Sequence, residues 1–433
     1  MIGVLRRRDF ALLWWGGLVS VAGDSMLLAV LPYVVYASTG STLATAGMTV
    51  AELVPGIVLG SVAGVFVDRW DRRRVLVVAN VLQAVTVAAL LVLAREPGLL
   101  AVVYVVAALQ SSLAAFSLPA ESSLLPTLVP EDDLVAANSL NVLNNRVGRL
   151  AGLPLGAAVY AWAGLGAVVA LDVASFLVAA GLVALLRVRH ARPVPTPPTG
   201  ERPRRLRAFL AEWADGLALV RRDRSIGVLF VVFGLMTFGG TMLDPLSAPW
   251  VRDVLHEGVG VYALLMTTHS LAGIAGSIAV GAIGARVAPH LLTGVGSLVA
   301  GCLLLVRFNV PVVAVAVALC LLSGLAAVAS SVGVETMAQQ RVPEAYRGRV
   351  FGSLHAWIWL LSLLGAVVGG VGAELVGVLP MLDVASLLTA AAGLVVLHRL
   401  TFRPWQQMVA PRRSSRRCSR TPASRSRSSS RSS

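Results

Sequence analysis

Long apolar runs, separated by short loops that carry most of the charges, constrain the fold of this chain more than any other feature. A helix needs roughly 20 apolar residues to cross the hydrocarbon core of a bilayer. Inside lipid the backbone has no water to bond, so a spanning segment satisfies its polar groups internally as a helix. The expected spans are residues 10–37, 43–67, 74–94, 98–118, 136–162, 165–187, 225–250, 260–285, 289–307, 311–333, 349–372 and 376–398. The pattern predicts an all-α integral membrane protein of twelve transmembrane helices.

The composition excludes a water-soluble fold and gives no sign of catalytic chemistry. Hydrophobic residues make up 57% of the 433 residues and charged residues only 13%, about half the charged share of a soluble protein. The sequence has no P-loop pattern, which argues against direct coupling to ATP. Its three cysteines and six histidines form no C-x-x-C or Cys/His cluster, so we expect no metal and no cofactor. We therefore expect a membrane protein that is not an enzyme.

The distribution of arginine predicts the orientation of the chain in the membrane. With the N-terminus on the cytoplasmic side, and with residues 399–433 left out, the inner side holds 23 arginines and the outer side holds 3. Cytoplasmic loops are enriched in basic residues, so both termini are expected in the cytoplasm, at a bacterial plasma membrane. These positions also explain the net charge of +14. We therefore expect membrane lipids, and no nucleic acid, around the basic residues.

Two short sequences recur at nearly the same offset and divide the chain into halves. Residues 129–131 (VPE) recur at 342–344, and residues 171–175 (LDVAS) recur at 382–386, with offsets of 213 and 211 residues. An offset that covers six spans preserves the topology, so the halves are parallel repeats. Such repeats indicate two pseudo-symmetric six-helix bundles around a central cavity. The alternative is chance similarity between apolar helices of biased composition.

The expected domain boundaries follow from this division and from two polar segments. Residues 1–187 are expected to form the first bundle and residues 225–400 the second. Residues 188–224 contain five prolines and a basic run, which predicts a cytoplasmic linker because proline disrupts a helix interior. Residues 401–433 are rich in arginine and serine, so we expect a disordered tail. That tail either contacts the anionic inner leaflet weakly or is dispensable; RNA binding through its Arg-Ser dipeptides is a third alternative.

The loop between the second and third spans carries the most specific motif. Residues 64–73 read GVFVDRWDRR, which resembles the cytoplasmic loop motif G-x-x-x-D-R-x-G-R-R of the major facilitator superfamily. Asp71 replaces the second glycine of that motif. The resemblance covers nearly the whole chain and implies a monomeric transporter with a small-molecule substrate.

The same resemblance implies that this loop is part of a latch at the cytoplasmic side. Its acidic residue can face the N-terminus of the eleventh span and pair with an arginine there, and its last two arginines can meet Glu121. These contacts would hold the cytoplasmic side shut while the outer side is open. The alternative is that the charges only orient the chain in the membrane. The residues of the expected latch are Gly64, Asp68, Arg69, Arg72, Arg73, Glu121, Arg347 and Arg349.

Further stretches resemble one bacterial branch of that superfamily. Residues 8–10 (RDF), 23–24 (GD) and 342–352 (VPEAYRGRVFG) resemble exporters that include enterobactin-type siderophore exporters and macrolide-efflux-like proteins. This resemblance implies secondary active transport, with proton-coupled efflux of a small drug-like or siderophore-like molecule by alternating access. An importer or facilitator of the same fold, and a transport-inactive membrane sensor, remain as alternatives.

Two acidic residues are expected near the middle of the membrane. Asp24 lies 14 residues into the first span and Glu52 lies 9 residues into the second, roughly 21 Å and 14 Å deep at the rise of a helix. A lone charge there costs at least ~2.5–3.5 kcal/mol. A carboxyl that is neutral when occluded and charged when wetted has the property that a proton carrier needs. Asp24 and Glu52 are therefore our candidates for coupling to protons or to a cationic substrate; the alternative is a structural hydrogen bond between helices.

The fifth span combines two arginines with a run of small residues. Residues 148–156 read GRLAGLPLG, which resembles the motif G-x-x-x-G-P-x-x-G of drug–proton antiporters with its proline displaced by one residue. Small residues allow tight packing, and the proline weakens the helix. Ordinary helix packing is the alternative. The candidate residues of this span are Arg146, Arg149, Gly152, Pro154 and Gly156.

Three further acids are expected to have structural roles. Asp172 and Asp383 occupy corresponding positions of the repeat, and we expect each to cap or bond a neighbouring helix. Asp244 lies beside Pro245 at the end of the seventh span. We expect a broken outer helix end there, which could serve as a gate.

Overall fold

The described part of the chain is almost entirely helical. The computed structural model describes residues 2–67, 70–95, 100–187, 224–283, 286–342 and 347–400, and within these ranges it contains no strand. Residues 188–223 of the expected linker and the expected tail 401–433 lie outside them. The helices are α1 (Ile2–Leu5), α2 (Arg8–Thr39), α3 (Thr42–Val67), α4 (Arg72–Ala88), α5 (Leu90–Arg95), α6 (Leu100–Leu128), α7 (Leu134–Ala184), α9 (Arg224–Leu243), α10 (Ser247–Asp253), α11 (Val259–Ile283), α12 (Pro289–Asn309), α13 (Val313–Arg341), α14 (Arg347–Val376) and α15 (Val378–Leu400), with a 3-10 turn at Glu131–Asp133.

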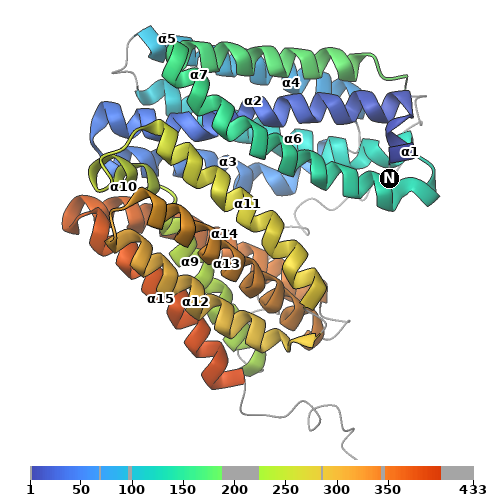
Figure 1. The fold of residues 1–433 in the computed structure, drawn as a ribbon. Helices are drawn as coiled ribbons and strands as arrows, with labels where there is room; N and C mark the ends of the chain where they lie inside the picture. The colour runs from blue at the N-terminus through green and yellow to red at the C-terminus, as the bar shows by residue number, and fades with distance from the viewer. Residues whose placement is uncertain are drawn as a thin grey trace, which may run out of the picture.

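The number of spans agrees with the sequence once a break in α7 is counted. Within the described ranges, eleven helices are long and apolar enough to cross a membrane. One of them, α7, has 51 residues, about 76 Å at the rise of a helix and more than twice the roughly 30 Å hydrocarbon core. Gly164 interrupts α7 with φ 74°, a left-handed conformation that glycine adopts without strain. The chain reverses there (Figure 1), so the prediction of twelve spans is confirmed.

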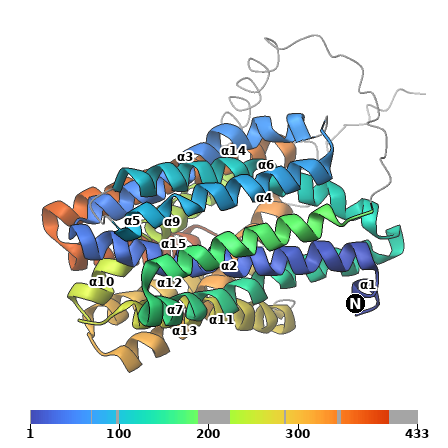
Figure 2. The same ribbon diagram turned by 90° about the horizontal axis from the view of Figure 1, so that it is seen from above.

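The helices form two bundles, each drawn from one half of the sequence. In the first bundle α2 packs along α7, and both α3 and α4 pack on α6. In the second, α12 packs on α13 and α15, and α9 packs on α14 and α15. Figure 1 shows the first bundle, coloured blue to green, above the second, coloured yellow to red. Figure 2 shows the bundles from above, with most helices running along the same long axis.

A row of glycines lets α7 approach α2 closely. A Cβ atom at Gly148 would lie 2.7 Å from the Val21 side chain, and one at Gly156 would lie 2.6 Å from the Cα of Met26. A Cβ at Gly152 would collide with the carbonyl oxygen of Ala22. Glycines spaced by four residues lie on one helix face, so this row forms one packing surface. The small residues of the fifth span therefore hold the first bundle together.

The two bundles touch through a few helices. α3 packs on α14, and α11 packs on α7 and α2. Gly370 of α14 brings α3 close, since a Cβ there would lie 3.1 Å from the Thr42 carbonyl oxygen. In Figure 1 the ribbons of the two bundles meet near α10 and diverge toward the start of α2. We call the end that carries Tyr36 and Asp253 the closed end, and the end where α2 begins the N-terminal end.

The end of α13 differs from the predicted limit, and the end of α9 agrees with the predicted helix break. α13 continues to Arg341, beyond the expected limit of residue 333, because the apolar pattern marks the lipid boundary and a helix can extend past it into water. α9 ends at Leu243 and α10 begins at Ser247. The expected helix break at Asp244 is therefore confirmed.

Replacing Gly152 by leucine should destabilise the first bundle, because the new side chain has no space against Ala22. Overpacking of this kind costs about 1–3 kcal/mol or more, so we expect the melting temperature of the purified protein to fall by about 1–3 °C or more. Size-exclusion chromatography after heating measures this. Gly181→Leu is the matched control on the same helix, because a Cβ at Gly181 meets nothing within 4 Å. Equal melting temperatures of the two variants would contradict this account of the α2–α7 contact.

Candidate functional site

Asp24 of α2 and Glu52 of α3 are neighbours inside the molecule. Both side chains are exposed, yet both lie deep among the helices, and the charge of Asp24 acts on Glu52. A side chain that is exposed at such depth faces a space between helices rather than the outer surface of the bundle. The structure thus brings together the two acids that the sequence singled out.

Arg149 of α7 supplies a positive charge to this pair. Its charge acts on both Asp24 and Glu52, and its own side chain is exposed. Arg146 points toward the second bundle, since its guanidinium Nη1 lies 3.5 Å from the position of a Cβ at Gly273 of α11. Residues three apart share a helix face, so both arginines border the space between the bundles. Pro154 is accommodated within α7.

The second bundle contributes an acid of its own. Asp244, in the break between α9 and α10, is exposed but lies deep in the protein, where the charge of Glu52 acts on it. Tyr262 of α11 is buried and feels the charge of Asp244. Acids from both bundles therefore lie within electrostatic reach of one another. The sequence predicted a helix end and a possible gate at Asp244 but not its proximity to Glu52, because a sequence does not say which residues of two bundles approach each other.

The repeat-related acids Asp172 and Asp383 have different surroundings. Asp172 is fully buried, accepts a hydrogen bond from the Ser175 hydroxyl at 3.1 Å, and would lie 2.6 Å from a Cβ at Gly23 of α2. Asp383 accepts a hydrogen bond at 2.7 Å from the side-chain amide of Asn309, at the end of α12. The bond from Asp383 to a neighbouring helix agrees with the structural role we expected.

Hydrogen bonds from the end of α2 join the bundles at the closed end. The Tyr36 hydroxyl donates to the carboxylate of Asp253. Arg252 donates to the Tyr36 carbonyl oxygen at 3.0 Å, and its guanidinium lies 5.7 Å from the centre of the Tyr36 ring. The Tyr33 hydroxyl donates to the carbonyl oxygen of Glu257 at 3.3 Å. The end of α2 is thus tied to the segment from α10 to α11.

The start of α3 adds further bonds between the bundles at the closed end. The Thr42 hydroxyl donates to the carbonyl oxygen of Gly370 at 2.9 Å, and the Thr45 hydroxyl donates to the carbonyl oxygen of Pro245 at 3.0 Å. The Glu374 carboxylate accepts a backbone N–H from the first turn of α3 at 3.3 Å. Opening this end requires all of these bonds to break together.

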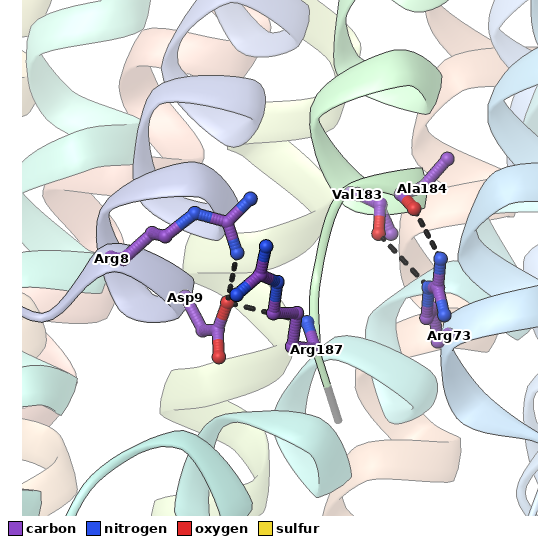
Figure 3. A network of polar contacts seen from close by, with 6 residues as sticks. All are labelled: Arg8, Asp9, Arg73, Val183, Ala184 and Arg187. Carbon is purple, nitrogen blue, oxygen red and sulfur yellow. Dashed lines mark hydrogen bonds and ion pairs between the residues drawn. The ribbon is translucent and has the colours of Figure 1, made fainter. Parts of the chain in front are cut away.

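At the N-terminal end, charged side chains bond helix ends within the first bundle. Arg73 donates to the carbonyl oxygens of Val183, at 3.4 Å, and of Ala184, at the end of α7. Asp9 accepts the backbone N–H of Arg187 at 3.3 Å. Figure 3 shows these contacts side by side. The last carbonyl groups of a helix lack partners and carry partial negative charge, so an arginine is a favourable cap for them.

The arginines of the loop motif use different partners from those we expected. Arg72 donates to the carbonyl oxygen of Ser123 at 3.0 Å, and Glu121 is hydrogen-bonded to Asn141. The expected contact of Arg72 and Arg73 with Glu121 is therefore not formed in this conformation. Carbonyl groups of α6 and α7 satisfy these arginines, and Asn141 bonds Glu121, so the contact within the first bundle is replaced by other partners in the same bundle.

The remaining residues of the expected latch are only partly described. Gly64 lies in the last turn of α3, and Arg347 and Arg349 lie in the first turn of α14. Asp68 and Arg69 lie outside the described residues. The closing of the N-terminal end by this latch stays a prediction.

Comparison with known proteins places the chain among membrane transport proteins. A family model described as Major Facilitator Superfamily matches residues 13–366. Macrolide efflux protein A of Streptococcus pyogenes is 25% identical over 382 residues, which cover 85% of this chain and 90% of that protein. Enterobactin exporter EntS of Citrobacter koseri is 26% identical over 389 residues, which cover 88% of each chain.

The fold is similar to that of a protein whose structure has been solved. A bacterial homologue of the iron transporter ferroportin, described in an inward-facing state, superposes with a TM-score of 0.71 at 17% identity. The match covers 90% of this chain and 98% of the homologue. At that identity the likeness concerns the fold alone.

Tyr36→Phe should loosen the closed end, because it removes the hydroxyl that donates to Asp253. A hydrogen bond to a charged group contributes about 1.5 kcal/mol or more, so we expect the population open at this end to rise about tenfold. A single cysteine in place of Val259, which is buried between the bundles, reports the opening through its rate of reaction with a water-soluble maleimide.

The matched control for this experiment is Ser38→Ala, because the Ser38 hydroxyl donates within its own helix, to the carbonyl oxygen of Val35. Ser38→Ala should react at the same rate as the parent protein. A Tyr36→Phe variant that reacts no faster than this control would show that the bond to Asp253 does not hold the closed end.

Proposed function

The chain belongs to the major facilitator superfamily, and we propose that it exports a small organic molecule in exchange for protons. The family and the fold make it a multi-pass membrane transporter and not an enzyme. Relatives named for efflux of macrolides and of enterobactin support export as the direction. The proposed substrate class is a small amphipathic molecule that enters the space between the bundles.

The observation that carries the proton coupling is the placement of Asp24 and Glu52. They lie at transmembrane depth, exposed to an interior space, within reach of each other and of Arg149. Removing a carboxylate from water disfavours its charged form. Such an acid loses its proton when water reaches it and holds the proton when the site is occluded. Two neighbouring acids that alternate in this way can carry protons in one direction while the substrate moves in the other.

The proposed orientation assigns a state to the observed conformation. The arginine-rich N-terminal end faces the cytoplasm, in line with the positive-inside rule. The closed end then faces the outside, and the conformation is inward-facing. Alternating access would break the bonds of Tyr36, Thr42 and Thr45 to the second bundle and bring the N-terminal ends of the bundles together.

The charges around the space favour a neutral or cationic substrate. Three acids, Asp24, Glu52 and Asp244, outnumber the two nearby arginines, of which Arg149 acts on Asp24 and Glu52 and Arg146 lies near Gly273 of α11. A substrate with one positive charge would replace a proton at the acids. An anionic substrate would add to their repulsion.

Asp24→Asn and Glu52→Gln should each abolish transport driven by a pH gradient, because neither amide releases a proton. Purified variants in proteoliposomes are tested with erythromycin, as a macrolide, and with ethidium, as a lipophilic cation. We expect the gradient-driven rate to fall at least about tenfold, within the range that loss of a proton-transferring group produces. Asp383→Asn is the control, since that acid is bonded to Asn309 away from the space.

Undiminished gradient-driven transport in both Asp24→Asn and Glu52→Gln would refute the assignment of the coupling acids. Inside-out vesicles with an acidic interior test the direction in the same preparation. The exporter should accumulate the substrate in such vesicles as protons leave. Loss of substrate from them under the same gradient would indicate import.

A further inference from the structure

Asp244 occupies an unusual position, in the helix break where the second bundle is bonded to the first. The break separates α9, which ends at Leu243, from α10, which begins at Ser247. The next residue, Pro245, has its carbonyl oxygen bonded by the Thr45 hydroxyl of α3 at 3.0 Å. The proposed coupling pair does not include Asp244, although Asp244 lies at the contact that keeps the closed end shut.

The geometry of α3 directs Glu52 toward the same break. Thr45 and Glu52 are seven residues apart on this helix, so they lie on the same face, about two turns or 10.5 Å apart along the axis. Because Thr45 contacts the chain right after Asp244, Glu52 faces the second bundle further into the membrane. The charge of Glu52 acts on Asp244 across the interface.

The charged groups around this pair are unequally distributed. Asp24 and Arg149 act on Glu52 from α2 and α7. Asp244 is subject to the charge of Glu52 and itself acts on Tyr262 of α11. Glu52 thus has a cation within reach, whereas the described groups that interact with Asp244 are an acid and a phenol.

We propose that Asp244 is a positioning residue that makes closure of the closed end depend on protonation. Glu52 and Asp244, one from each bundle, repel each other when both are ionised, and a proton on either removes the repulsion. This inference rests on the proposed proton exchange. It adds that proton binding acts on the contact between the bundles at the closed end. The inference depends on the acid at the helix break. This acid is next to Pro245, whose carbonyl oxygen accepts a hydrogen bond from Thr45.

The direction of the effect follows from Coulomb repulsion. Two like charges held together by the closed end raise the free energy of that conformation, more strongly in a protein interior than in water. Loss of the protons therefore favours separation at the closed end. Binding of a proton favours closure, because the neutral acid can remain beside a carboxylate without repulsion.

This direction agrees with exchange of substrate for protons. In the inward-facing conformation the acids release protons to the cytoplasm, and the resulting repulsion between Glu52 and Asp244 prepares the closed end to open. In the outward-facing conformation protons arrive from outside, and the closed end can form again. Protonation and the closed end are thus linked by one pair of side chains.

The closed end can be monitored by a spin-label distance. Labels at Ser38, near the end of α2, and at Leu375, near the end of α14, occupy exposed positions on opposite bundles, in a background whose three cysteines are replaced by serine. Pulsed electron–electron resonance in lipid nanodiscs at pH about 5 and about 8.5 measures the distance distribution. We expect the parent protein to shift toward longer distances at the higher pH.

Asp244→Asn should reduce this pH-dependent shift to less than half, since one member of the pair no longer ionises. Asp244→Glu keeps the charge and should keep the shift. Asp383→Asn, an acid of the same bundle bonded to Asn309, should also leave the shift intact. If Asp244→Asn does not fold, Glu52→Gln removes the same repulsion from the other side and should give the same loss.

A shift of parental size in Asp244→Asn, or a parent protein whose distances do not respond to pH, overturns the inference. Because the distances are measured without substrate or gradient, the result is independent of the transport assay. If the proposed proton coupling is wrong, the Asp24→Asn and Glu52→Gln variants keep the parental transport rate. The parent protein could then still show the pH-dependent distance. The two proposals therefore fail in distinguishable ways.

Discussion

The cost of placing a charge in hydrocarbon governs the arrangement of this molecule. Insertion of a lone carboxylate at mid-membrane is unfavourable by at least ~2.5–3.5 kcal/mol, and the chain carries several acids at that depth. Asp24 and Glu52 are exposed residues, and the positive charge of Arg149 acts on both, which lowers this cost. Asp172, by contrast, is fully buried and accepts a hydrogen bond from the Ser175 hydroxyl. The packing of the helices into two bundles provides the space that these acids require.

The contact between the bundles differs in kind from the contacts within them. Within the first bundle, α2 and α7 are in backbone contact through Gly148, Gly152 and Gly156. Between the bundles, the closed end combines packing of α3 on α14 with hydrogen bonds of Tyr36, Thr42 and Thr45. Each such bond contributes about 0.5–1.5 kcal/mol when neutral and more when charged. The proposed repulsion between Glu52 and Asp244 acts across this contact, so protonation would shift it without disturbing either bundle.

The features that follow from depth in the membrane were predictable from the sequence, and those that follow from rotation about the helix axes were not. Apolar length gave the spans, and counting residues into a span gave the depth of Asp24 and Glu52 because a helix rises by a constant step. Whether Asp244 lies near Glu52 depends on the rotation of one bundle relative to the other. No local sequence pattern encodes that rotation. The caps that Arg73 places on Val183 and Ala184 were missed for another reason: main-chain carbonyl groups have no residue signature. The break of α7 at Gly164 was anticipated as a loop between two spans, since an apolar run of that length exceeds the membrane.

We propose that Asp24 and Glu52 face a water-reachable space between the bundles. Substituted cysteines test this access, in membranes and with a charged, water-soluble thiol reagent. Cysteines at positions 24 and 52 should react readily, whereas a cysteine at Val85, an exposed apolar position of α4, should be protected by lipid. Cysteines at 24 and 52 that react as slowly as the one at 85 would mean that the acids have no access to water, and the account of proton exchange would be wrong.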